Sequence, residues 1–390
     1  MRLRLRNLAL DLVLGSLRLT LGVLSRLVPQ SRSVVVAASP ESEGNAVEVA
    51  RALVRRHHGR VVWLRPGGAP PVEVAELARA GLVLVPKASV RGLWAYLRAE
   101  AVLFTHGLYG NPRPCARKPV VNLWHGDGPK DIRPGRTVGP LVRSTYLVGS
   151  TPLFSHFQAD AFGVPRERVL LTGNARTDQL WRVPGADRLA ALGVTGDFVV
   201  WMPTFRRPRA IGAVRVRPGS TSAADTGPEQ VEALREALHR RGLQLVVKPH
   251  PMDADRRRHP GVVTLDEADL VRTGVTLYGL LGASRGLVTD YSSVWVDYLL
   301  LDRPMAFLTH DRGSYDRALF PADVLDWVPG ELVDADARPF AHFLADLDTG
   351  GRLDADRRRE VARRIGLVAS HSAADDLVTE LVKRGVLSSG

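Results

Sequence analysis

Short apolar runs alternate with amphipathic segments along most of the chain. The run Val-Val-Val-Ala-Ala at residues 34–38 predicts a buried parallel strand, and the apolar spacing of residues 46–56 predicts the helix that follows it. The same unit recurs as far as residue 157, and a second series of strands and helices starts at residue 197. Strands that alternate with helices predict parallel sheets covered on both faces.

The break between the two series falls at residues 181–185, which have the composition of a linker. We therefore divide the chain into an amphipathic basic helix at 1–30, a first domain at 31–184 and a second domain at 185–390. The last helix either stays on the second domain or crosses back to the first. The predicted fold class is α/β, with two Rossmann-like, doubly wound domains facing a cleft. In such sheets ligands bind beyond the carboxyl ends of the strands.

The predicted strands are apolar runs that end in polar or turn-forming residues. In the first series they begin at Val34, Val61, Gly81, Ala101, Pro119 and Ser144, and in the second at Asp197, Leu243, Gly261, Gly286 and Pro304. Residues 206–228 break the pattern, because they are rich in Gly, Pro and Ser, contain five arginines and show no periodicity. This stretch predicts a long loop, either a solvated surface loop or a lid over an anionic substrate.

The first 28 residues combine many Leu and Val with one narrow stripe of polar and small residues at helical spacing. The stripe consists of Arg4, Asn7, Asp11, Gly15, Arg18, Gly22 and Ser25. Asp11 and Arg18 interrupt the apolar run that a membrane-spanning helix needs, and no small-residue cleavage site follows the segment. Two interpretations stay open: a helix in the bilayer interface with its arginines on anionic head groups, or a helix packed on the protein body.

Composition narrows the class of protein. The 390 residues are 45% hydrophobic and 24% charged, which is typical of globular domains, and the single cysteine, Cys115, argues against a disulfide framework or a multi-cysteine metal site and fits a reducing cytoplasm. The net charge of +12 favours an anionic partner. Because 48 of the 53 basic residues are arginine, part of this charge reflects composition. A nucleic-acid-binding protein is an alternative, but the sequence has no motif for it.

Three polar segments follow apolar strands. In the segment from Asn122 to Ile132, His125 lies where the chain must turn, and its imidazole suits a general base. Gly126 beside it leaves room for a substrate. The next two segments contain Thr204 with Arg206, and Lys248 with His250, which suit donors to phosphate oxygens. Each residue type also has a purely structural explanation, since a histidine after a strand often only packs.

The fourth segment, residues 286–311, is the most informative. Its apolar strand ends at Asp290, and Ser292 and Ser293 open a helix whose free N–H groups and hydroxyls suit a diphosphate. Asp297 lies one helical turn further on and is expected to face the same mouth. The structural alternative is an N-cap that binds no ligand.

Together, the segments NLWHGDGPKDI, GNARTDQL, MPTFRR, KPHP and TDYSSVWVDYLLLDRP resemble, in this order, those of the CDP-glycerol glycerophosphotransferases, the teichoic-acid primases and polymerases. The resemblance covers about residues 33–320. It implies a GT-B architecture in which the second domain holds most of the donor, and peripheral attachment to the cytoplasmic face of the membrane.

The resemblance also implies roles for individual residues. His125 would be the catalytic base and His250 would stabilise the donor phosphates, while Ser292 and Ser293 would hold the diphosphate near Asp297. The remaining matches to the family motifs are Thr204, Arg206, Arg176 and Asp178. Gly-Asp-Gly-Pro-Lys stands here where the family usually has Gly-Thr-Pro-Leu-Lys after its Trp-His, so we expect acceptor contacts that differ from the family's.

The function that follows is transfer of a polyol phosphate from a CDP-linked donor to a lipid-linked glycan acceptor. A hydroxyl deprotonated by His125 would attack the distal phosphorus, and CMP would leave. No metal constellation is visible and no cofactor is expected, although Mg²⁺ stays open. The main alternative is a GT-B glycosyltransferase that uses a nucleotide sugar, and a relative that only binds a glycan is a further one. The polyol, the acceptor, primase or polymerase action and the oligomeric state are not fixed by the sequence.

Overall fold

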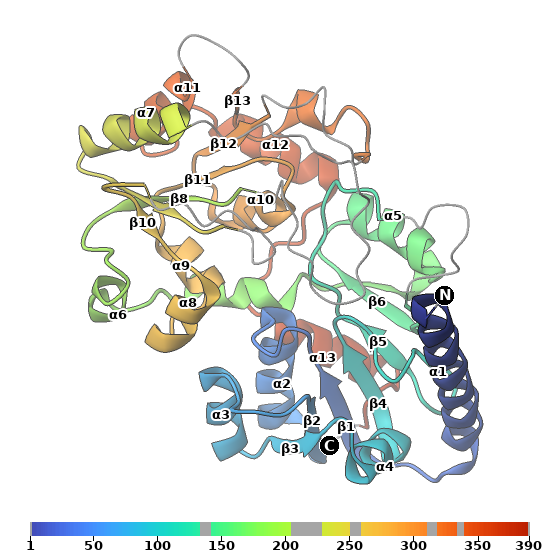
Figure 1. The fold of residues 1–390 in the computed structure, drawn as a ribbon. Helices are drawn as coiled ribbons and strands as arrows, with labels where there is room; N and C mark the ends of the chain where they lie inside the picture. Colours follow the sequence, from blue (N-terminus) through green and yellow to red (C-terminus); the bar gives the residue numbers. More distant parts are fainter. Residues whose placement is uncertain are drawn as a thin grey trace. The chain divides into compact units, whose positions relative to one another are not determined.

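The computed structural model describes residues 2–132, 142–203, 228–249, 259–309, 318–333 and 339–388 (Figure 1). The side chains of residues 2–14, 228 and 229 are not part of this description. The chain forms two compact units. The first unit consists of residues 1–127, 132–178 and 368–390, and the second of residues 128–131 and 179–367.

The first unit is built on a seven-stranded parallel sheet. The strands lie in the order β3-β2-β1-β4-β5-β6-β7, with the bounds β1 (Ser31–Ala37), β2 (Arg60–Arg65), β3 (Val83–Pro86), β4 (Ala99–Phe104), β5 (Val120–Asn122), β6 (Tyr146–Gly149) and β7 (Val169–Leu171). Its helices are α1 (Arg2–Leu27), α2 (Gly44–Arg56), α3 (Val72–Arg79), α4 (Val90–Arg98), α5 (Pro152–Phe162) and α13 (Ala373–Lys383), with short 3₁₀ helices η1 (Arg166–Arg168) and η2 (Ala175–Trp181).

Both faces of this sheet are buried. Val34 and Val36 of β1 point into a cluster with α2, α3 and α13, whereas Val35 and Ala37 point into a cluster with α1, α4 and α5. This alternation explains why β1 reads as one continuous apolar run. Figure 1 shows α13, the last helix of the chain, lying against the sheet that contains β1.

Helix α1 packs on the first unit through Leu21, with Leu17, Leu24 and Val28 packed against the same cluster, and through part of the stripe that looked polar in the sequence. Gly22 and Ser25 are buried there, and the guanidinium of Arg18 donates to the carbonyl of Gly110 at 2.7 Å. Larger apolar side chains on another face of the helix point outward. Leu19, Val23 and Leu27 are 73%, 56% and 69% exposed, respectively. No helix among the described residues has an apolar stretch long enough to cross a bilayer.

The second unit is built on a six-stranded parallel sheet. The strands lie in the order β10-β9-β8-β11-β12-β13, with the bounds β8 (Phe198–Trp201), β9 (Gln244–Val247), β10 (Val263–Thr264), β11 (Gly286–Thr289), β12 (Met305–Leu308) and β13 (Glu331–Val333). Its helices are α6 (Ala186–Ala190), α7 (Pro228–His239), α8 (Glu267–Thr273), α9 (Leu277–Ala283), α10 (Val294–Tyr298), α11 (Ala341–Asp348) and α12 (Ala355–Ile365), with 3₁₀ helices η3 (Leu299–Leu301) and η4 (Val324–Trp327). Val199 and Val288 pack under α7 and α11, and Trp295 of α10 contacts Phe307 edge-on.

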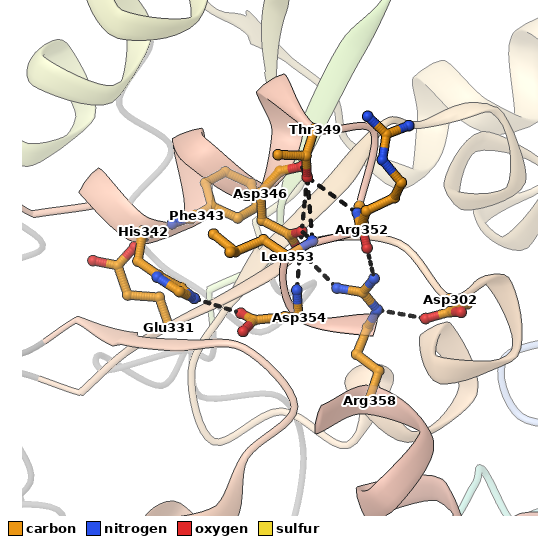
Figure 2. Close-up of polar contacts among 11 residues, drawn as sticks. Asp302, Glu331, His342, Phe343, Asp346, Thr349, Arg352, Leu353, Asp354 and Arg358 are labelled. Atoms are coloured by element: carbon orange, nitrogen blue, oxygen red, sulfur yellow. Dashed lines mark hydrogen bonds and ion pairs between the residues drawn. The ribbon is translucent and has the colours of Figure 1, made fainter. Parts of the chain in front are cut away.

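A buried arginine holds the C-terminal helices of the second unit to the loop after η3 (Figure 2). Arg358 of α12 is 1% exposed and donates to Asp302 at 2.6 Å, to Asp346 at 2.7 Å and to the carbonyl of Gly351. Asp302 has a positive φ of 47°, an uncommon conformation for a residue with a Cβ. The guanidinium therefore fixes the turn through which the chain passes from α10 to β12.

The α/β class and the eleven predicted strands are confirmed. The structure adds β7 and β13, two strands of three residues each that the apolar pattern did not predict. The chain changes units after Asp178 rather than after residue 184, and residues 368–390 return to the first unit. Of the predicted loop at 206–228, residues 206–227 lie outside the described residues, and Pro228 begins α7.

Candidate active site

His125 lies in a sharp turn after β5, at the carboxyl edge of the first unit's sheet. Trp124 and Gly126 on either side of it have positive φ values of 48° and 102°. The imidazole stacks on that of His106, with ring centroids 4.8 Å apart and planes 10° apart, and it also contacts the ring of Trp124 at 3.8 Å. Burial lowers the pKa of His106, so this neighbour is neutral at pH 7.

The main chain around His125 is held by side chains from three other elements. Arg176 of η2 donates to the carbonyl of His125 at 2.6 Å, Asn45 of α2 to that of Trp124 at 3.2 Å and Gln158 of α5 to that of Gly126 at 3.2 Å. A Cβ on residue 126 would lie 1.8 Å from Nη2 of Arg176. The space that the sequence assigned to a substrate at Gly126 is therefore occupied by the Arg176 guanidinium.

Asp127 is a residue of this site that the sequence analysis did not single out. Its buried carboxylate accepts from the N–H groups of Ser150 and Thr151 at 2.7 and 2.8 Å and from the hydroxyl of Ser155 at 2.7 Å. These donors surround the N-terminus of α5, where a negative charge is stabilised. The sequence carries no separate signal for this role, because Ser-Thr-Pro at 150–152 is a typical helix start in which Thr151 already caps α5.

Asp178 of η2 binds the C-terminal segment of the first unit. Its carboxylate oxygens accept from the N–H groups of Ala373 and Ala374 at 2.7 and 3.1 Å. Asp178 thus binds the first turn of α13 and ties the returning C-terminal segment to the first unit.

In the second unit, the predicted phosphate-binding segment follows β11. Asp290 accepts from the N–H group of Ser292 at 3.2 Å, and Ser293 is the N-cap of α10, a helix of only five residues. A Cβ on Gly128 would lie 2.2 Å from that of Ser293, so only glycine allows this close packing. Asp297 is 2% exposed and accepts from the hydroxyl of Tyr278 at 2.6 Å. This contact binds its carboxylate to α9.

Lys248 directly follows β9 and is almost fully buried, with 4% of its surface exposed. Its Nζ donates to the carbonyl of Pro249 at 3.4 Å and lies 3.8 Å from a carboxylate oxygen of Glu267. The other three predicted donor-binding residues, Thr204, Arg206 and His250, lie outside the described residues. The structure thus brings His125, Gly126 and Arg176 together in one unit, and Asp290, Ser292 and Ser293 together in the other.

The sequence matches the family model described as CDP-Glycerol:Poly(glycerophosphate) glycerophosphotransferase over residues 36–383. The chain belongs to this family. The match includes most of both units, and it confirms the resemblance that the motifs carry. The protein is therefore a CDP-glycerol glycerophosphotransferase-like enzyme.

Individual relatives agree with this assignment. A teichoic acid glycerol-phosphate transferase of Staphylococcus aureus is 28% identical over 284 residues, 64% of this chain and 68% of that protein. A teichoic acid ribitol-phosphate primase of Bacillus spizizenii is 28% identical over 213 residues, 50% of this chain and 52% of that protein. The solved structure of the wall teichoic acid polymerase TagF matches 99% of this chain and 97% of its own with a TM-score of 0.69 at 17% identity. This likeness confirms the GT-B type of fold.

Proposed function

We propose that this enzyme moves a polyol phosphate, most directly glycerol phosphate, from a CDP-linked donor to a lipid-linked cell-wall glycan at the cytoplasmic face of the membrane. Family membership supports the donor class, and the names of the two relatives support glycerol phosphate or ribitol phosphate as the transferred group. The observation that carries the proposal is the turn at His125. Side chains from three elements fix its main chain, and a neutral imidazole stacks on its ring.

In the proposed reaction, His125 takes the proton of an acceptor hydroxyl while that oxygen attacks the distal phosphorus of the donor. A new P–O bond forms as the bond between that phosphorus and the CMP oxygen breaks, and CMP leaves with the negative charge. Such transfers depend on positioning and electrostatic stabilisation. Cations and hydroxyls of the second unit would balance the charge: Thr204, Arg206, Lys248, His250, Ser292 and Ser293.

The stacked pair of imidazoles favours this role for His125. A base that accepts a proton becomes an imidazolium, and a charged neighbour 4.8 Å away would oppose that change. Because burial lowers the pKa of His106, the neighbour adds no charge at pH 7. Nη1 of Arg176 donates a hydrogen bond to the carbonyl oxygen of His125, and this bond fixes the main chain of the turn.

CMP release tests the proposal. Purified protein with a lipid-linked acceptor should release CMP from CDP-glycerol or CDP-ribitol, and His125→Ala should reduce turnover by about 10²–10⁴-fold. His58→Ala is the matched control, because His58 is an exposed histidine of the same unit. Wild-type turnover in His125→Ala would remove the proposed base. Release only from UDP- or GDP-linked sugars would replace the function with that of a sugar transferase.

The outward stripe of α1 supports attachment to the membrane surface. Leu19, Val23 and Leu27 follow one another at four-residue spacing and are more than half exposed, and Arg26 is exposed beside them. We expect Leu19→Ser, Val23→Ser and Leu27→Ser together to weaken sedimentation with vesicles of phosphatidylglycerol. Val183→Ser with Leu353→Ser, which alters exposed apolar residues of the second unit, is the control. Equal binding by the two variants would leave α1 as a packing element.

We expect turnover without a bound cofactor. The predicted charge-balancing groups are arginine, lysine, histidine and serine, and within the described residues no group of three or more His, Cys, Asp or Glu side chains is placed to hold a metal ion. Dialysis against EDTA should leave CMP release unchanged. Loss of release that Mg²⁺ restores would add a metal to the mechanism.

A further inference from the structure

The first unit has a large cavity at the edge of its sheet opposite to His125. The cavity has a volume of about 970 Å³, and its lining includes Glu100 near the start of β4, Pro119 before β5, Tyr146 at the start of β6 and Arg168 before β7. These positions mark the amino edge of a parallel sheet. His125 follows the carboxyl end of β5, so the cavity is separate from the candidate active site.

The lining is strongly basic. Four arginines, Arg113, Arg117, Arg168 and Arg384, face one carboxylate, that of Glu100. The carboxylate is already engaged, because its Oε2 accepts from the N–H group of Ser388 at 3.3 Å and its Oε1 lies 3.2 Å from Nε2 of His57. The net charge of the lining therefore favours an anion.

Several donors of the lining are available to a ligand. Within the described parts of the chain, the guanidinium groups of Arg113 and Arg168 make no hydrogen bond or ion pair, and the buried atoms Oγ of Ser144 and Nε2 of Gln30 have no hydrogen-bond partner. Buried polar atoms normally have a partner. Planar guanidinium groups bind phosphate oxygens with two parallel hydrogen bonds, which a single lysine cannot do.

Arg384 shows how part of the lining is organised before any ligand binds. It donates to Glu380 at 2.6 Å and to the carbonyl of Glu167 at 3.3 Å, and its guanidinium lies 5.7 Å from the ring centroid of Tyr146. Val386 and Leu387 add an apolar wall. A cavity of this volume accommodates an organic molecule in addition to its anionic group.

We propose that this cavity is a second ligand site, which binds a phosphate ester that carries a short organic group. The ester has two sources, a free polyol phosphate or the head group of a phospholipid. The loop at the cavity rim supports the second source, because Arg117 donates to the carbonyl of Arg26 at 3.2 Å and Cys115 contacts that of Ser25. The rim is thus joined to the end of α1 that exposes Leu27. The proposal does not depend on the transfer reaction.

A pair of charge-matched variants tests the site. Arg113→Gln with Arg168→Gln removes two guanidinium groups from the cavity, and Arg143→Gln with Arg166→Gln removes two exposed ones of the same unit outside it. Equilibrium dialysis measures binding of glycerol 3-phosphate, and flotation measures binding to vesicles of phosphatidylglycerol against phosphatidylcholine. Circular dichroism checks that both variants are folded.

We expect the cavity variant to lose affinity about tenfold or more for one of the two probes, glycerol 3-phosphate or phosphatidylglycerol vesicles. The control variant should keep the wild-type affinity for that probe. A loss confined to glycerol 3-phosphate identifies a soluble ester, and a loss confined to phosphatidylglycerol vesicles identifies a lipid head group. Equal behaviour of the two variants in both arms would overturn the proposal. Because neither measurement needs turnover, failure of the proposed transferase activity leaves this test intact.

Discussion

The two segments expected to carry the chemistry are held in place by different means. The turn at His125 is fixed by donors from neutral or positive side chains to its main chain, and by the Asp127 carboxylate at the start of α5. The segment after β11 is held by side chains that lie outside α10. The hydroxyl of Tyr278 binds Asp297, and Arg358 binds the loop that follows.

This comparison shows what the acidic residues near the two segments bind. Asp127 and Asp297 are both buried and both bind donors of their own unit, so each stabilises the local fold. The first carboxylate relies on N–H groups and serine and threonine hydroxyls, which do not titrate. The second relies on a tyrosine hydroxyl. The two halves should therefore respond differently to substitution, and a second buried tyrosine of the second unit, Tyr298 of α10, adds a dependence on pH.

The largest effect is expected from Arg358→Met in the second unit. It leaves the carboxylate of Asp346 buried without its charged partner, which costs about 3–5 kcal/mol of the free energy of unfolding. Urea unfolding followed by circular dichroism measures this. Arg359→Met, which changes an exposed arginine of the same helix, should unfold like the wild type. A shift of similar size in both variants would show that the buried network contributes little.

Asp127→Ala should cost about 3 kcal/mol, because several buried donors lose one shared acceptor. Unlike Arg358→Met, it should also lower the turnover of the folded protein at least about tenfold, since the His125 turn loses its anchor. Urea unfolding and CMP release measure the two effects. Asp160→Ala, at the exposed end of the same helix, is the control. Unchanged turnover in folded Asp127→Ala would separate this anchor from the chemistry.

Gly126→Ala is expected to cost about 2 kcal/mol, because it adds a Cβ at a φ of 102° and places it against Arg176. Adding Arg176→Ala should remove the clash but not the backbone strain, so the double variant should recover only part of the loss. Gly196→Ala, where a Cβ has open space, is the control. A double-mutant cycle on unfolding free energies measures the coupling. Zero coupling would contradict the close approach.

The smallest effect concerns Tyr298 and alkaline pH. Burial raises the pKa of Tyr298 to about 12, and its hydroxyl lies 2.8 Å from that of Ser284. Between pH 10 and 12 the unfolded chain releases this proton while the folded chain keeps it, so the free energy of unfolding falls as pH rises. Tyr298→Phe should cost about 1 kcal/mol at pH 7 and show a shallower fall. Parallel pH profiles for the wild type and Tyr298→Phe would contradict this assignment.

The strand pattern predicted most of the fold because buried parallel strands are short, continuous apolar runs. The destination of the last helix stayed open, since Leu377 and Leu381 would suit either sheet. The choice depends on Asp178, which binds the first turn of α13 from 195 residues away. Pattern alone does not reveal a cap contributed from so far along the chain.

The N-terminal helix is a second example of a contact that the hydropathy pattern does not reveal. Its small residues looked like part of a polar face, yet Gly22 and Ser25 are buried together with Leu21 on the side that packs. In a helix with apolar residues on most of its surface, the hydropathy pattern does not show which face is buried. In the candidate site, the sequence identified the turn at His125 but not Asp127, because a buried carboxylate that serves as an anchor looks the same in a sequence as one that serves as a ligand.

The return of α13 has a consequence for synthesis on the ribosome. Most of the first unit precedes the second in the sequence, but Ala374, Leu377 and Leu381 of its core follow the second unit. The second unit emerges whole while the first still lacks a helix over one face of its sheet. A chain stalled before residue 368 exposes the apolar side chains of α2 that α13 covers, and so offers chaperones and proteases a surface that the finished protein hides.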